Sequence, residues 1–150
     1  MQMIRTLGLG LLAGVVCTMA AASLVLPSIQ AEEAKADTRV YELRTYYALP
    51  GRLDALHARF KNHTIRLFEK HGMKNLMYWV PTDPEKGKDT LIYVLEHRSA
   101  AAAEESWKAF RADPEWLKVK GESEQSGPIV AKADSVMMKA VDYSPHLKQK

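Results

Sequence analysis

The chain of 150 residues contains a single cysteine, Cys17. Cys17 lies in an uncharged, mostly apolar stretch, residues 6–29. If this stretch is cleaved off, the remaining chain has no thiol, which excludes disulfides, a cysteine nucleophile and thiolate metal ligands. A lipoprotein signal requires a small residue just before its cysteine, and Val16 stands there, so we expect no lipid anchor.

Several other functional signatures are also missing. The sequence has no GxGxxG loop and no serine flanked by glycines as in hydrolase elbows. No two histidines stand four residues apart, and His63 and His71 lie about 12 Å apart along one predicted helix, so we predict no metal site. The 21 basic and 18 acidic residues give a net charge of +3 without a basic run. We therefore predict no nucleic-acid partner.

The N-terminus has the pattern of a secretory signal peptide over residues 1–31. Arg5 is the only charged residue there, the stretch 6–29 follows it, and Ala31 provides a small-residue end. We expect cleavage after Ala31, with Ala22 as the second candidate. The alternative is an uncleaved membrane anchor, because the apolar stretch reaches the ~20 residues that a span needs. Either way the sequence predicts an extracytoplasmic protein, periplasmic or secreted, with membrane contact only through residues 6–29.

The rest of the chain divides into a linker over residues 32–37, a domain over residues 38–143 and a tail over residues 144–150. Hydrophobic periodicity and turn residues predict the domain's elements. Strands are expected at 38–47, 73–80, 90–97 and 133–141, and helices at 52–71, after Ser99 and after Asp113. This β-α-β-β-α-β order predicts an α+β, ferredoxin-like fold, an antiparallel sheet with helices on one face.

The predicted strands have apolar or mixed residues on both faces, although the helices cover only one. We therefore expect a second copy of the chain to cover the other face, which makes the protein a homodimer. In the first strand, alternation places Glu42, Arg44 and Tyr46 on one face and Tyr41 and Leu43 on the other. We interpret the face with Tyr41 and Leu43 as the buried one.

Three segments, VYELRTYYALPGRLDAL, HTIRLFEKHGM and DPEW, resemble the NIPSNAP family over about residues 39–143. The resemblance implies a dimeric α+β barrel, in which the sheets of two chains pack face to face. Glu42, Arg44 and Tyr46 would then line the barrel or its interface, and a charge reversal at Arg44 should weaken the dimer. The sequence departs from the residues usual in the family at Leu95 and His97. Its predicted signal peptide also differs from the mitochondrial targeting of the animal members.

We expect a pocket between the sheet and the first helix or at the mouth of the barrel. Six groups are candidates for binding a ligand because they are polar-tipped or ionisable on otherwise apolar elements: Arg44, Tyr46, His63, Trp79, Glu96 and His97. Glu42 and Glu96 could form a carboxylate pair for acid–base chemistry, but the favoured interpretation is that Arg44 neutralises one of them.

The function predicted from these features is an exported homodimeric module that binds a small organic molecule or a partner. No catalytic residue and no cofactor are assigned. The alternative, which the resemblance suggests through its wider superfamily, is an enzyme that resembles cofactor-independent monooxygenases or haem-handling proteins and acts on a small aromatic compound.

Overall fold

The structure, a computed structural model, describes residues 38–145. The signal peptide and the linker expected before residue 38, and the last five residues of the tail, lie outside this range. In the part of the chain that is described, no helix is long and apolar enough to cross a membrane.

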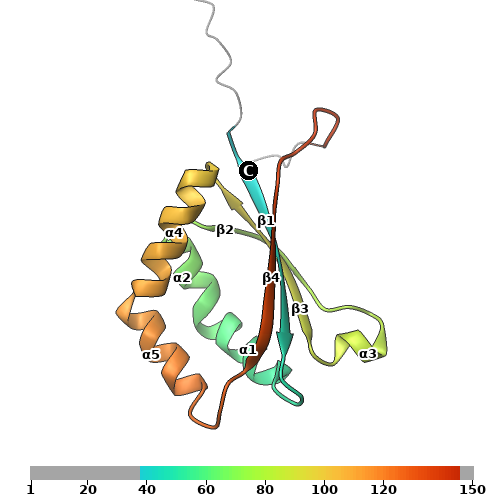
Figure 1. Ribbon diagram of the computed structural model, residues 1–150, viewed down its shortest axis with the longest axis vertical. Coiled ribbons are helices and arrows are strands. Elements are labelled where there is room, and N and C mark those ends of the chain that lie inside the picture. Colours follow the sequence, from blue (N-terminus) through green and yellow to red (C-terminus); the bar gives the residue numbers. More distant parts are fainter. Residues whose placement is uncertain (1–37, 146–150) are drawn as a thin grey trace, which may run out of the picture. The chain divides into compact units, whose positions relative to one another are not determined.

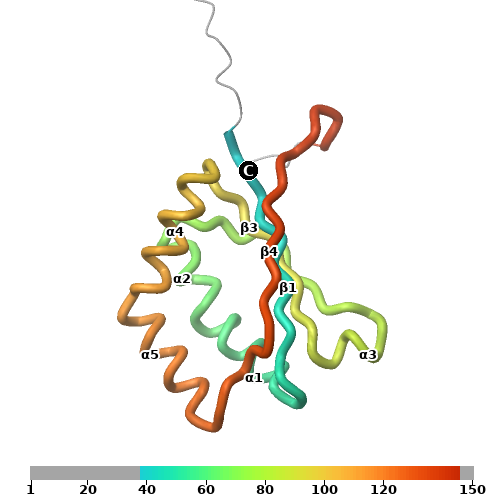
Figure 2. The backbone as a smooth tube through the Cα atoms, viewed as in Figure 1, coloured from blue at the N-terminus to red at the C-terminus, as the bar shows by residue number. Residues whose placement is uncertain are grey.

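Four strands form one antiparallel sheet in the order β2-β3-β1-β4. The strands are β1 (Val40–Ala48), β2 (Lys74–Trp79), β3 (Thr90–His97) and β4 (Val130–Met138). The first and last strands of the chain therefore lie side by side, as the ferredoxin-like topology requires (Figure 2). The α+β, ferredoxin-like fold predicted from the sequence is confirmed.

The first helical segment runs as α1 (Leu53–Arg59), a π-helical turn η1 (Phe60–Thr64) and α2 (Ile65–Lys70). Leu56 and Phe68 are both fully buried. Twelve residues of plain α-helix, at 100° each, would place them about 120° apart around the axis. The π-turn absorbs one residue, which reduces the angle to about 20° and points both side chains at the sheet. The helix ends at Lys70, and the turn that follows it contains Gly72, whose φ of 76° suits glycine.

The second helical segment comprises α4 (Ala100–Ala112) and α5 (Pro114–Ser123). The side chain of Ser99 accepts a hydrogen bond from the N–H of Ala102, and that of Asp113 accepts one from the N–H of Glu115, so these residues cap the two helices that the sequence predicts after them. Asp113 also binds Lys70 and His71 at the end of α2, which lowers the pKa of its carboxyl. A short helix, α3 (Pro84–Gly87), lies in the loop between β2 and β3.

Helices α1, α2, α4 and α5 all lie against one face of the sheet, and α3 lies apart from them (Figure 1). The core between the two layers is apolar, and its fully buried members are Leu56, Leu67, Phe68, Met73, Tyr93, Leu95 and Ile129. No helix of the described chain covers the other face, which we call the helix-free face.

The prediction for the two faces of β1 is wrong. The face with Glu42, Arg44 and Tyr46 lies beneath the helices, and the face with Tyr41 and Leu43 does not. Glu42 binds Trp107 of α4, Arg44 stacks on the same indole, and Tyr46 packs against Phe60. These side chains therefore lie beneath the helices of their own chain and not inside a two-chain barrel. Tyr41 and its neighbours on alternate positions lie on the helix-free face. Glu42 and Arg44 can occupy the covered face because each of them is hydrogen-bonded there.

The last strand begins and ends three residues earlier than the predicted range, 133–141. Leu49 donates its backbone N–H to the carbonyl of Ile129 at 2.9 Å, so pairing with the end of β1 begins before the first predicted residue. Val136 and Met138 lie on the helix-free face, opposite Leu43 and Tyr41 of β1.

Candidate functional site

A buried carboxylate, Glu42, is the centre of the polar network beneath the helices. Its Oε2 accepts a hydrogen bond from the indole N–H of Trp107 at 2.6 Å and lies 3.0 Å from Nε2 of His97. Its Oε1 accepts from the Ser135 hydroxyl at 2.6 Å and from the Arg44 guanidinium at 2.9 Å. We call these five residues the Glu42 cluster.

The environment of Glu42 holds it in the ionised form. Burial by itself raises the pKa of the carboxyl, but the hydrogen bonds from His97, Ser135, Trp107 and Arg44 outweigh burial and lower the pKa to about 2. At neutral pH Glu42 is thus a fixed negative charge with both oxygens occupied. It can position its neighbours, but it has no proton to give to a ligand.

Arg44 connects the Glu42 cluster to the aromatic side chains beneath the helices. Its guanidinium carbon lies 4.6 Å from the ring centre of Trp107, and its Nη2 donates to the Tyr46 hydroxyl at 3.3 Å. Burial acts to lower the pKa of Arg44, but the oxygens of Tyr46, Tyr93 and Glu42 outweigh it and raise the pKa. Arg44 therefore remains charged and holds the Tyr46 ring in place.

A cavity of about 300 Å³ lies next to this network, between the sheet and the helices. Its lining includes five aromatic rings, those of Tyr46, Phe60, Phe68, Phe110 and Trp116. Several of these rings touch one another edge to face, for example Tyr46 and Phe60 at 5.7 Å and Phe68 and Phe110 at 4.9 Å. We call this space the aromatic cavity.

Polar groups of the aromatic cavity come mainly from α1 and from the end of α5. Arg59 donates to Glu124 at 2.8 Å and lies 5.4 Å from the Trp116 ring centre, so it is part of a fixed wall. Lys120 also lines the cavity, and its ammonium group has no hydrogen-bond or ion-pair partner among the described residues. On the sheet side, Ala133 of β4 leaves room beside Tyr46, which it faces across the strand pair.

Several side chains near the cavity have shifted pKa values that fix their protonation state at neutral pH. Burial raises the pKa of the Tyr93 hydroxyl and of the Tyr78 hydroxyl, so both phenols stay protonated at neutral pH. Glu42 is shifted in the opposite direction and stays ionised.

The structure brings together three of the six side chains predicted to bind a ligand. Arg44, Tyr46 and His97 all lie beneath the helices, with Arg44 and His97 both bound to Glu42. Glu96 and Glu42 lie on neighbouring strands but on opposite faces of the sheet. The hypothesised carboxylate pair is therefore wrong, and the favoured alternative, that Arg44 neutralises Glu42, is confirmed.

The other three predicted residues lie away from the aromatic cavity. Glu96 forms ion pairs with Lys74 and Arg39 at the helix-free face. His63 lies in a groove between α1 and α5, beside Asn62 and Val119. Trp79, at the end of β2, lines a different cavity.

Sequence reasoning missed the residues that close the aromatic cavity. Phe60 and Trp116 carry no local sequence signal beyond apolar residues of predicted helices, and nothing in the sequence links Arg59 to Glu124. The pair joins positions 65 residues apart, which no local pattern reveals. In the described range, no group of three or more His, Cys, Asp or Glu side chains is arranged to hold a metal ion.

Comparisons with known proteins identify the family of this domain. The model of the NIPSNAP family matches residues 41–145. A search of curated proteins finds no match.

The solved structures that resemble this chain include several from bacteria. An uncharacterized NIPSNAP-like domain protein from Burkholderia xenovorans superimposes with a TM-score of 0.64 at 14% identity, covering 75% of this chain and 93% of that chain. A NIPSNAP family protein with unknown function from Agrobacterium tumefaciens has a TM-score of 0.62 at 20% identity, covering 73% and 95%. At these identities the likeness shows the fold, and the family model adds the assignment: the chain belongs to the NIPSNAP family.

Proposed function

We propose that this protein is an exported homodimer that binds a small aromatic molecule in the aromatic cavity. The observation that carries the proposal is the lining itself, five aromatic rings around about 300 Å³. This volume is at the lower end of the ~300–1,000 Å³ range of ligand pockets. A flat ligand would pack against the rings, and its polar substituent would meet Lys120 or the Tyr46 hydroxyl.

Binding is favoured over catalysis because the strongest polar groups are already occupied by one another. Glu42 accepts four hydrogen bonds, and Arg59 is held by Glu124. Such groups fix the shape of a site, whereas a catalytic acid or base needs a free position toward the substrate. Histidine, a frequent axial ligand of haem iron, does not line the aromatic cavity in the described chain, so we do not extend the proposal to haem.

The proposed homodimer uses the helix-free face. This face presents Leu43 of β1, Val94 of β3 and Val136 of β4 at its centre, and Val136 is 53% exposed in the single chain. Monomeric proteins seldom expose an apolar sheet face of this kind. A second copy is the occupant that we propose, because the face is apolar at its centre and carries both signs of charge at its border, in the pairs Lys132–Asp134 and Lys74–Glu96.

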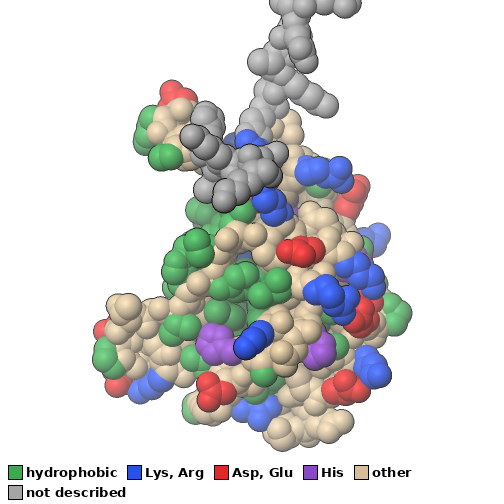
Figure 3. Space-filling model, turned by 180° about the vertical axis from the view of Figure 1, so that it is seen from behind, with side chains coloured by type: hydrophobic (Ala, Val, Ile, Leu, Met, Phe, Trp, Pro, Cys, Tyr) green, Lys and Arg blue, Asp and Glu red, His purple; other side chains and the backbone are tan. Residues whose placement is uncertain are grey.

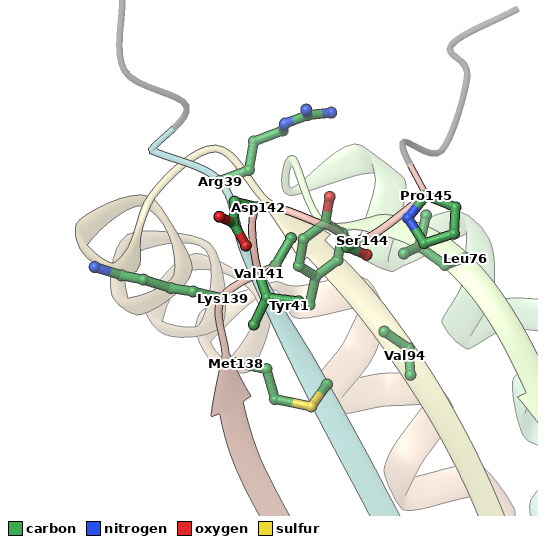
Figure 4. A pocket seen from close by; sticks show the side chains of 11 residues that line it. Arg39, Tyr41, Leu76, Val94, Met138, Lys139, Val141, Asp142, Ser144 and Pro145 are labelled. Carbon is green, nitrogen blue, oxygen red and sulfur yellow. The ribbon is translucent and has the colours of Figure 1, made fainter.

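A cavity of about 640 Å³ also opens on this face. Figure 4 shows side chains from all four strands, Leu76, Val94, Tyr41 and Met138, next to the segment that follows β4. Figure 4 also shows Val141 and Pro145 of that segment beside the sheet. This segment covers one end of the helix-free face and leaves the middle of the sheet for the partner chain.

Export is proposed from the N-terminal sequence alone. Arg5, the apolar stretch 6–29 and Ala31 are the features that support it. Intact-mass measurement of protein recovered from the periplasm or the medium should give a chain that begins near Glu32. A cytoplasmic protein that begins at Met1 would contradict this part of the proposal.

Ligand binding is tested with 2-naphthol, a neutral aromatic probe, and with the variant Ala133→Leu. The larger side chain should fill the space beside Tyr46 and weaken binding at least tenfold, measured by the change in tryptophan fluorescence. Ala109→Leu on α4 is the matched control, because Ala109 is exposed and lines none of the cavities described. The proposal fails if the unaltered protein binds no small aromatic molecule at micromolar concentration, or if both variants bind equally.

The same samples test the enzymatic alternative. After incubation with 2-naphthol in air, mass spectrometry should recover the probe unchanged. Recovery of an oxidised product in amounts exceeding the protein would refute a pure binding role and favour the oxygenase.

A further inference from the structure

A second cavity, of about 370 Å³, lies between the first helical segment and the β2 edge of the sheet. It is bounded by α1 and η1 on one side and by the end of β2 and the start of β3 on the other. Phe60 lines both this cavity and the aromatic cavity, so its buried ring separates the two spaces. We call the second space the edge cavity.

The walls of the edge cavity are apolar. Ile65 and Phe60 line it from the helix, and Tyr78, Val80 and Leu91 line it from the sheet side. Val80 is 41% exposed, so apolar surface continues from the cavity to its mouth. Figure 3 shows this side of the molecule, where hydrophobic side chains gather with histidine and cationic side chains next to them.

The polar groups that line the edge cavity are the side chains of His57 and Lys61, the Tyr78 hydroxyl and the indole N–H of Trp79. His57 and Lys61 stand four residues apart on the helix and both line the cavity. Neither side chain has a hydrogen-bond or ion-pair partner among the described residues. By contrast, Lys70 and Lys132 are both bound to aspartates. No aspartate or glutamate of the described chain lines the edge cavity, so the side chains of His57 and Lys61 are available to an anion.

The sheet side of the edge cavity is held in a fixed shape. The ring of Tyr78 stacks on Tyr93 at 5.2 Å, and its hydroxyl donates to the side chain of Asn75. Beyond Val80 the loop packs tightly: Gly87 lies so close to Pro81 that a Cβ added at Gly87 would be 2.5 Å from the Pro81 carbonyl oxygen. The cavity therefore exists before any ligand binds, which limits the entropy lost on binding.

We propose that the edge cavity is a second ligand site and that it takes a small aliphatic carboxylate. The hydrocarbon chain would lie along Ile65, Tyr78 and Leu91, and the carboxylate would sit at the mouth, where Lys61 supplies a positive charge and His57 an N–H donor. Apolar walls favour the chain, and the unpaired lysine favours an anion over a neutral or cationic head group. This site is independent of the aromatic cavity and of the function proposed for it.

The test uses octanoate as the probe, with octylammonium as its cationic counterpart, and isothermal titration calorimetry on the full chain. Octanoate should bind at least tenfold more tightly than octylammonium. Lys61→Gln should weaken octanoate binding about tenfold. Ala58→Leu, which fills the cavity from the helix, should also weaken it. Lys108→Gln, an equal change of charge at an exposed and unpaired lysine of α4, should leave binding unchanged.

Two results would overturn the proposal. One is that Lys61→Gln and Lys108→Gln affect octanoate equally, and the other is that octylammonium binds as tightly as octanoate. Both lysines are exposed, so unchanged thermal unfolding should show that the variants remain folded. Ala133→Leu in the aromatic cavity should not change octanoate binding, and Lys61→Gln should not change 2-naphthol binding. Failure at one cavity is thereby distinguishable from failure at the other.

Discussion

Replacing Glu42 with glutamine should destabilise the domain severely, although the two side chains have almost the same shape. Glu42 is 3% exposed and accepts four hydrogen bonds. A glutamine amide keeps one accepting oxygen but turns an NH2 group toward donors that previously met the second oxygen. It also leaves the partly buried guanidinium of Arg44 without its counter-charge.

The size of the effect follows from the lowered pKa of Glu42. A fall from 4.5 to about 2 corresponds to about 3 kcal/mol, since one pKa unit is about 1.4 kcal/mol. Removing one partner of a buried ion pair typically costs about 3–5 kcal/mol. We therefore expect the variant to lose about 3–5 kcal/mol of its free energy of unfolding, a large part of the ~5–15 kcal/mol typical of a domain.

The pH dependence gives the sharper measurement. The pKa of Glu42 is lower in the folded chain than in the unfolded one, so its stabilisation is complete above pH 4.5 and declines as the pH falls toward 2. Urea unfolding followed by tryptophan fluorescence should show a difference between the two proteins that is about 2 kcal/mol smaller at pH 3 than at pH 7. Glu122→Gln, at an exposed position of α5, should change the stability by no more than about 0.5 kcal/mol. A loss below about 1 kcal/mol for Glu42→Gln, or a difference that does not shrink at pH 3, would refute this reasoning.

Three further predictions address the assembly, the helices and the separation of the two cavities. Val136→Glu should convert the proposed dimer to a monomer in light scattering at micromolar concentration without changing the circular dichroism. Leu117→Glu, at a similarly exposed position on α5, should remain dimeric. A Val136→Glu protein that is still dimeric would show that the helix-free face is not the interface. Gly121→Ala should stabilise the chain by about 0.5–1 kcal/mol, because Gly121 is helical and nothing lies within 4 Å of the added Cβ; lower stability in urea unfolding would contradict this. Phe60→Ala should lower the free energy of unfolding by about 3–5 kcal/mol. It should also make octanoate and 2-naphthol compete for binding, since the ring that separates the two cavities is gone. Independent binding of the two probes to the folded variant would show that another group separates the cavities.

The fold could be predicted from the sequence because its signals are local. Ser99 and Asp113 cap helices through groups two or three residues away, and the strand order follows from the sequence of elements. The inner face of β1 could not be predicted in this way. Its hydrogen-bond partners Trp107 and Ser135 lie 65 and 93 residues from Glu42, so the sequence presented two charges on a strand without the groups that satisfy them.

The candidate site was predicted only as far as side chains on one strand could be grouped. Arg44 and Tyr46 alternate along β1 and indeed share a face. Glu96 was grouped with them although it lies on the other face, because the pairing register of β3 with β1 is a tertiary property. His63 is grouped with them as an ionisable group on an otherwise apolar helix, and the structure places it in the groove between α1 and α5.

The π-turn at Phe60–Thr64 has a consequence for how the length of this domain can vary. Because the turn absorbs one residue, a chain that lacks one of its exposed members, Lys61 or Asn62, could close the segment into an unbroken α-helix. The side chains before and after the turn would still point at the sheet, as the angle between Leu56 and Phe68 requires. Related chains could therefore differ by a single residue at this point while the two layers stay in the same register. The lysine that we assign to the edge cavity would be one of the residues that such a change can remove.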